Sequence, residues 1–139
     1  MDEHVNASES DRLRFEPLRA EHAALLFEAL GDPRVSRHLN REPPASIDEL
    51  SRHFADVAAG PPPHLSHQRW VDFAVRAKAG GEWIGRVEST VHGEWAEVAY
   101  LFGPAHWGQG YTTESLAWLR RFLESQHGVT EFWAAWQIC

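Results

Sequence analysis

The chain has 139 residues, of which 43% are hydrophobic, and its formal net charge is −7 at pH 7. This length and apolar content favour one folded domain and exclude a disordered chain. The acidic balance argues against non-specific nucleic-acid binding, which requires a basic face. It is compatible with cationic partners such as amines, or simply with solubility.

Cys139 is the single cysteine, so an intrachain disulfide and a cysteine-based zinc site are both excluded. The polar start does not resemble a signal peptide, and no apolar run approaches the roughly 20 residues that span a bilayer. His64 and His67 have no supporting carboxylate pattern, so we expect no metal site. We therefore expect a reduced, cytoplasmic protein that binds neither membrane nor nucleic acid.

The N-terminal third predicts a leader, one strand and three helices. Residues 1–11 are polar and are expected to be flexible, and residues 12–139 are expected to form a single domain. Residues 13–19 alternate apolar and charged side chains, and Pro17 favours an edge strand because it cannot donate to a ladder.

The three helices follow from apolar periodicity and from start and stop signals. We expect the first over residues 20–30 before Gly31, and a short second one over residues 33–39 after an N-terminal Asp-Pro. Ser46 and Glu49 form a capping-box pattern that opens a third helix, which stops at Gly60.

The centre changes to a period of two residues, which is typical of strands. Residues 70–78, 82–92 and 94–102 are expected to form an antiparallel meander with glycine-containing turns between them. A helix should begin near Tyr111 and stop at Gly128. A last strand over residues 130–138 should be parallel to its neighbour after this helical crossover. The main elements follow the order β-α-α-β-β-β-α-β, which predicts a mixed α+β fold with a mostly antiparallel, twisted sheet flanked by helices.

The segment Gly108-Gln109-Gly110 lies at the junction between the third central strand and the long helix. Free N–H groups at a helix start attract anions, and glycine lets a phosphate approach the main chain. Thr112 and Thr113 add hydroxyl donors. The junction therefore predicts a phosphate cradle, although the same glycines would also suit a plain tight turn. No triphosphate-loop or dinucleotide fingerprint is present.

The same junction, "PAHWGQGYTTE", is similar to a motif of the GNAT superfamily of acyl-CoA-dependent N-acetyltransferases. The pattern P-x-x-W-G-x-G-Y-x-T-E resembles in particular the subgroup that includes ribosomal-protein N-terminal acetyltransferases. "LRFEPLRAEHAALLFEAL" and "WIGRVES" also look like this subgroup, so the resemblance extends from about Leu13 onward. Ala105 departs from the superfamily pattern, which has Arg or Gln at that position.

The resemblance implies a site for acetyl-CoA and an amine acceptor, either a protein N-terminus or a small molecule. Main-chain amides from residues 107–112 would hold the CoA diphosphate, and the main chain of Leu101 and Phe102 would pair with the pantetheine arm. An amide of that strand would polarise the thioester carbonyl. The expected cofactor-binding residues are Leu101, Phe102, Trp107, Gly108, Gln109, Gly110, Tyr111, Thr112 and Thr113.

Acetyl transfer needs a base that takes a proton from the amine. "AEVAY" resembles an A-E-I stretch in which some family members carry this base, so the resemblance implies that Glu97 is the catalytic residue. The alternative is that Glu97 is a solvent-facing strand residue, with Glu88 and Glu94 next in line as bases. No tyrosine occupies the family's position for a general acid.

The family usually continues beyond "AAWQI" with a further helix and a hairpin, so the domain is expected to be C-terminally incomplete. A missing tail, a natural truncation, or a second protomer in a homodimer would each account for this. A non-catalytic acyl-CoA-binding or interaction module and a nucleotide-binding domain are the alternatives to an acetyltransferase.

Overall fold

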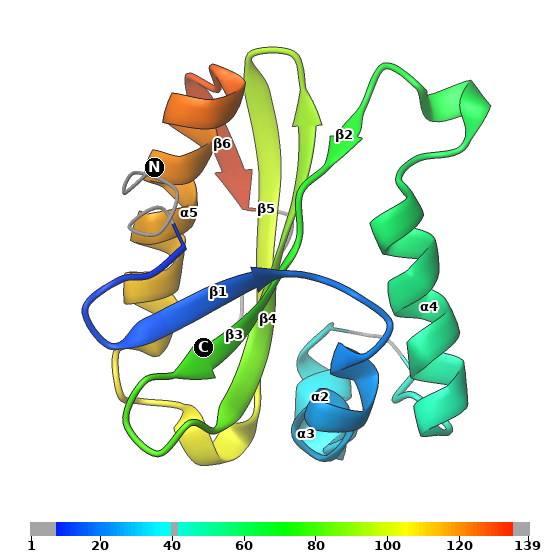
Figure 1. Ribbon diagram of the computed structural model, residues 1–139, viewed down its shortest axis with the longest axis vertical. Helices are drawn as coiled ribbons and strands as arrows, with labels where there is room; N and C mark the ends of the chain where they lie inside the picture. The colour runs from blue at the N-terminus through cyan, green and yellow to red at the C-terminus, as the bar shows by residue number, and fades with distance from the viewer. Residues whose placement is uncertain (1–7, 40–41, 135–139) are drawn as a thin grey trace.

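The computed structural model describes residues 8–39 and 42–134 and contains one mixed sheet (Figure 1). Its strand order is β1-β3-β4-β5-β6, with the short β2 also paired to β4. The pairs are antiparallel except for β5 and β6, which are parallel. The strands are β1 (Leu13–Pro17), β2 (Arg69–Trp70), β3 (Phe73–Ala77), β4 (Trp83–His92), β5 (Trp95–Phe102) and β6 (Glu131–Ala134). The predicted fold class, the central meander, the edge position of β1 and the parallel last strand are confirmed.

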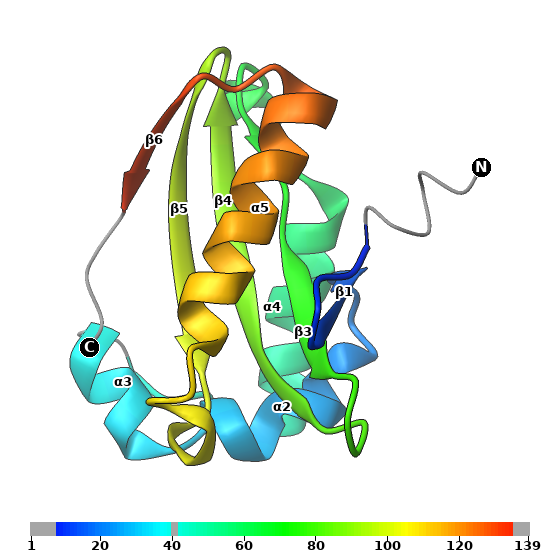
Figure 2. The same ribbon diagram turned by 90° about the vertical axis from the view of Figure 1, so that its left-hand side faces the viewer.

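The helices cover the two faces of the sheet separately (Figure 2). The long α5 (Tyr111–His127) crosses one face, and α4 (Ile47–Ala59) lies on the other. Helices α2 (His22–Leu30) and α3 (Pro33–Leu39) lie on the same side of the sheet as α4. Two short 3₁₀ turns, η1 (Pro63–Leu65) and η2 (Pro104–His106), were not expected from the sequence. No helix among residues 8–39 and 42–134 is long and apolar enough to cross a membrane.

The predicted capping box fixes the start of α4. The hydroxyl of Ser46 accepts a hydrogen bond from the Glu49 N–H at 3.1 Å. The Glu49 carboxylate accepts the N–H of Ala45 at 2.8 Å, one residue before the position that the motif implies. These two hydrogen bonds hold the first turn of α4 in place. Helix α4 forms one wall of the site described below.

Apolar side chains form a separate core on each face of the sheet. On the α5 face, the ring of Phe15 stacks on Trp118 with centroids 3.9 Å apart. Trp118 is almost fully buried beneath this helix. On the opposite face, Leu26, Phe54 and Ala74 are fully buried in the second core. The residues at the end of β5 contribute to both cores.

The strand expected over residues 70–78 is interrupted, which corrects the prediction. β2 ends at Trp70 and β3 begins at Phe73, although both pair with β4. The reason is that the carbonyl oxygen of Asp72 accepts the N–H of Leu18 at 3.0 Å, so Asp72 bonds to the chain after β1. The alternation of faces is nevertheless kept, because Trp70 and Asp72 lie on the α4 side and Phe73 on the α5 side.

Two predicted terminal segments are only partly described. Within the predicted leader, residues 8–11 contact the domain, and Glu9 lies 2.7 Å from the ammonium group of Lys78. Residues 1–7 lie outside the described residues, as do residues 135–138 of the expected last strand. Trp133 in β6 is 58% exposed.

Candidate functional site

The junction between β5 and α5 has two glycines in the left-handed region. Gly108 has φ = 75° and Gly110 has φ = 83°, conformations that residues with a Cβ adopt rarely. A Cβ added to Gly108 would meet no atom within 4 Å, so the surface of the loop is open there. Both properties are what a main-chain binding site for a bulky anion requires.

The N–H groups of this loop are available to a ligand. Among the described residues, the main-chain N–H groups of residues 108–113 donate to no other main-chain group. Gly110 is the N-terminal cap of α5 and supplies no side-chain acceptor for them. Free N–H groups at the positive end of a 17-residue helix form an anion site, so the residues present fit a phosphate ester.

Trp107 differs from the expectation that its amide binds the diphosphate. Its N–H donates to the carbonyl of Pro104 at 3.2 Å, within the turn of η2. Its indole N–H donates to the carbonyl of Phe102 at 2.7 Å. Trp107 therefore anchors the loop to the end of β5 and leaves anion binding to the residues that follow.

The end of β5 has one edge without a strand partner. Within the described residues, β6 pairs with Trp95–Val98 only. The N–H of Gly103 donates to Ile84, and peptide groups alternate in direction along an antiparallel ladder. It follows that the peptide groups of Phe102 and Tyr100 face the unpaired edge, whereas those of Leu101 face β4. This corrects the expectation that the main chain of Leu101 pairs with a pantetheine arm.

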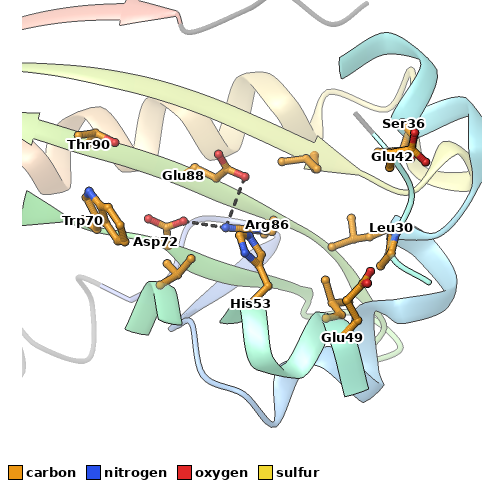
Figure 3. Close-up of a pocket in the computed structure, with 15 residues that line it drawn as sticks. Leu30, Ser36, Glu42, Glu49, His53, Trp70, Asp72, Arg86, Glu88 and Thr90 are labelled. Carbon is orange, nitrogen blue, oxygen red and sulfur yellow. Dashed lines mark hydrogen bonds and ion pairs between the residues drawn. The ribbon is translucent and has the colours of Figure 1, made fainter. Parts of the chain in front are cut away.

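The side chain of Leu101 instead lines a cavity of about 580 Å³ on the α4 face (Figure 3). The walls come from β2 and the residues after it, β4, β5, α4 and the segment around α3. Polar groups predominate around its middle, where Figure 3 shows Asp72, Arg86 and Glu88 close together. The lining residues used below are Glu42, Glu49, His53, Trp70, Asp72, Arg86, Glu88 and Leu101.

A buried guanidinium between two carboxylates forms the floor of this cavity. Nη2 of Arg86 lies 2.8 Å from Asp72 Oδ2 and 3.4 Å from Glu88 Oε2. Burial, opposed by the Arg86 charge, raises the pKa of Asp72 to about 6. The guanidinium also stacks over the ring of Phe54 at 5.0 Å. With two carboxylates and one cation, the cluster carries one surplus negative charge when both acids are ionised.

Glu97, the predicted base, lies on the same face of the sheet but outside this cavity. It pairs with Thr90 across the ladder, two residues from the level of Glu88. Its side chain is 45% exposed, and its Oε2 lies 3.3 Å from His92 Nε2. It borders a second hollow with Trp95 and Trp133. The strand places it roughly 16 Å along β5 from Phe102, at the far end from the glycine loop.

Sequence reasoning missed two charged residues of the site, Asp72 and Arg86. The available signal was a charge inside an apolar strand, as in "WVDFAV" and "WIGRVES". Among the residues that the structure describes, no three His, Cys, Asp or Glu side chains are grouped in a way that could hold a metal ion.

Comparison with known proteins identifies the family of this chain. Residues 12–138 match the model of the acetyltransferase (GNAT) domain. No curated protein matches the chain. An acetyltransferase (GNAT family) from Bacillus anthracis has a similar structure, with a TM-score of 0.73 and 12% identity over 91% of this chain and 70% of that one.

Two further solved structures have informative names. The acetyl transferase that modifies the N-terminal serine of ribosomal protein L7/L12 in Salmonella typhimurium has a TM-score of 0.72 and 16% identity, over 88% of this chain and 70% of that one. Spermidine N-acetyltransferase from Vibrio cholerae, in complex with CoA and spermine, has a TM-score of 0.69 and 17% identity, over 90% and 71%. At these identities the likeness shows the fold, whereas the domain match covers nearly the whole chain. The chain therefore belongs to the GNAT family of acetyltransferases and is an acyl-CoA N-acetyltransferase by family, as the pattern around residues 104–114 predicted.

Proposed function

We propose that the chain transfers an acetyl group from acetyl-CoA to the primary amine of a protein N-terminus or a small molecule. One observation supports this above all. The free N–H groups of the loop and the acidic cavity are joined by two neighbouring residues, because Phe102 turns its peptide to the open edge and Leu101 turns its side chain into the cavity. A donor bound on one side therefore meets an acceptor bound on the other.

On the donor side, we assign the diphosphate of acetyl-CoA to the main-chain N–H groups of residues 108–113. The hydroxyls of Thr112 and Thr113 lie in the first turn of α5 and add donors there. The pantetheine arm extends along the unpaired edge of β5, where the peptides of Phe102 and Tyr100 are available as partners. An N–H group of this edge polarises the thioester carbonyl.

On the acceptor side, the charge of the cavity favours an amine. Four carboxylates line it, from Glu42, Glu49, Asp72 and Glu88, against the single guanidinium of Arg86 and the imidazole of His53. A protonated amine gains from this excess on binding, whereas an anionic acceptor is repelled. A protein N-terminus and a small amine both satisfy this requirement.

The reaction is a direct attack of the amine on the thioester. The neutral nitrogen forms a C–N bond with the carbonyl carbon, the C–S bond breaks, and CoA leaves as the thiolate. Glu97 takes the proton that the nitrogen loses. Glu97 lies opposite Thr90, which lines the cavity, and this proximity supports the assignment; Glu88, which itself lines the cavity, is the alternative base.

Ligand-dependent thermal unfolding tests the donor site. We expect acetyl-CoA and CoA at 100 times their dissociation constant to raise the unfolding midpoint by about 8 to 10 °C, from about 2.7 kcal/mol of linkage. ATP and NAD should leave it unchanged. Stabilisation by ATP or NAD but not by CoA would assign the loop to a nucleotide and overturn the proposal.

Thiol release from acetyl-CoA in the presence of amines tests the chemistry. We expect Glu97→Gln to lower kcat about 100-fold while the affinity for CoA stays the same. Glu124→Gln, the same charge change at an exposed position of α5, is the control and should be fully active. Normal turnover in Glu97→Gln with a loss in Glu88→Gln would move the base to Glu88. Binding of CoA without thiol release for any amine would indicate a non-catalytic module.

A further inference from the structure

Arg12, which immediately precedes β1, reaches across to the glycine loop. Its side-chain Nε donates to Glu114 Oε1 at 2.6 Å, and its main-chain N–H donates to Glu114 Oε2 at 2.8 Å. Its Nη1 donates to the main-chain carbonyl of Gln109 at 3.0 Å. One side chain therefore connects the start of the domain, the first turn of α5 and the middle of the loop.

The surroundings hold this guanidinium in one orientation. The Ser10 hydroxyl also donates to Glu114, at 2.5 Å, and the guanidinium carbon of Arg12 lies 4.5 Å from the centroid of the Tyr111 ring. Burial opposes ionisation of Glu114, but the hydrogen bonds from Ser10 and Arg12 outweigh it and lower the pKa of that carboxyl. Glu114 is therefore a fixed anion that orients Arg12.

The bond from Arg12 to Gln109 determines where the next N–H points. The structure has no cis peptide among its described residues, so the carbonyl of Gln109 and the N–H of Gly110 point in opposite directions within their shared peptide plane. Glycines at positions 108 and 110 let this plane rotate easily. A bond that holds the carbonyl against Arg12 keeps the Gly110 N–H turned away, among the free donors of the loop.

We propose that Arg12 is a positioning residue for the cofactor, because it fixes the Gln109–Gly110 peptide so that the Gly110 N–H faces the diphosphate. The inference rests on the proposed function of the loop. The charge of Arg12 is already balanced by Glu114, so the residue acts through the direction of its hydrogen bonds. A lysine keeps the charge but lacks the planar fork that bonds Glu114 and Gln109 together.

Calorimetric titration with CoA and with dephospho-CoA tests this assignment. Dephospho-CoA keeps the diphosphate but lacks the 3′-phosphate, so it separates the two phosphate sites. We expect Arg12→Lys and Arg12→Met each to weaken binding of both ligands about tenfold. Arg14→Met, the same charge change at a neighbouring exposed position of β1, should bind like the wild type.

Steady-state kinetics distinguish positioning from a general loss of structure. KM for acetyl-CoA should rise about tenfold in both variants, whereas kcat and the KM for the amine should stay within twofold. Wild-type affinity in Arg12→Lys, wild-type affinity in Arg12→Met, or a loss confined to CoA would each overturn the proposal. If Arg12→Met does not fold, Arg12→Lys decides. If the wild type itself binds no CoA, the proposed function fails. If the wild type and the Arg12 variants all bind CoA equally well, only the role of Arg12 fails.

Discussion

Replacing Arg86 by methionine should destabilise the protein strongly, and the loss should depend on pH. Methionine keeps most of the volume of the side chain but removes the cation between Asp72 and Glu88. The side chains of Arg86 and Asp72 are 4% and 8% exposed, so little solvent replaces the lost partner. Breaking a buried ion pair by removing one partner costs about 3–5 kcal/mol. For a chain of 139 residues, this corresponds to a fall of about 10 to 17 °C in the unfolding midpoint.

The pH dependence follows from the raised pKa of Asp72. A folded-state pKa of about 6, against an ordinary value of 3.8, means that the folded protein holds this proton more tightly than the unfolded chain. The stabilisation from this proton is present at low pH and is lost as the pH rises through about 6. At pH 5 Asp72 is mostly neutral with or without Arg86, so removing the guanidinium leaves fewer uncompensated charges.

Thermal unfolding followed by circular dichroism at pH 7.5 and pH 5 measures both effects. The difference between the wild type and Arg86→Met should be large at pH 7.5 and clearly smaller at pH 5. Adding Asp72→Asn to Arg86→Met should restore part of the stability at pH 7.5, because it removes one of the two orphaned charges. An equal difference at both pH values, or an unchanged midpoint at pH 7.5, would refute the electrostatic account of this cluster.

Two further predictions concern the helix starts that shape the site. Ser46→Ala removes the cap of α4 and should lower the free energy of unfolding by about 1 kcal/mol, measured by thermal or urea unfolding. The control Ser125→Ala, near the end of α5, should have little effect. Equal stability of the two variants would contradict the capping role of Ser46. Gly110→Val should weaken CoA binding at least tenfold in calorimetry, because valine is strained at φ = 83° and its Cβ would lie 3.3 Å from Arg12. Gly93→Val carries similar strain at φ = 70° in a distant turn, so it should lose stability but keep its affinity for CoA. Unchanged CoA affinity in Gly110→Val would remove the loop from the donor site.

The elements of the fold were predictable because their signals are local. Apolar periodicity, the capping box at Ser46 and the glycine stops gave the order and most boundaries of the helices and strands. The interruption at Asp72 was not predictable, because its cause is a bond to Leu18, 54 residues away along the chain. The alternation of apolar and polar residues cannot reveal that a carbonyl bonds to a residue distant in sequence instead of to the neighbouring strand.

The site was predictable only where a motif marks it. The glycines at 108 and 110 indicated a loop with unusual main-chain freedom before α5, and both have a positive φ. Asp72 lies between β2 and β3 and Arg86 lies in β4, so their contact depends on the sheet and no short pattern contains it. The same holds for Arg12, which meets Gln109 across 97 residues of sequence.

The division of the apolar interior into two halves, one beneath α5 and one beneath α2 and α4, has an evolutionary consequence. The cavity proposed for the acceptor lies on the α4 side, so substitutions there can reshape it while the half beneath α5 remains intact. Under the proposed function, a lineage or a laboratory selection can therefore change which amine is acetylated without changing the donor site.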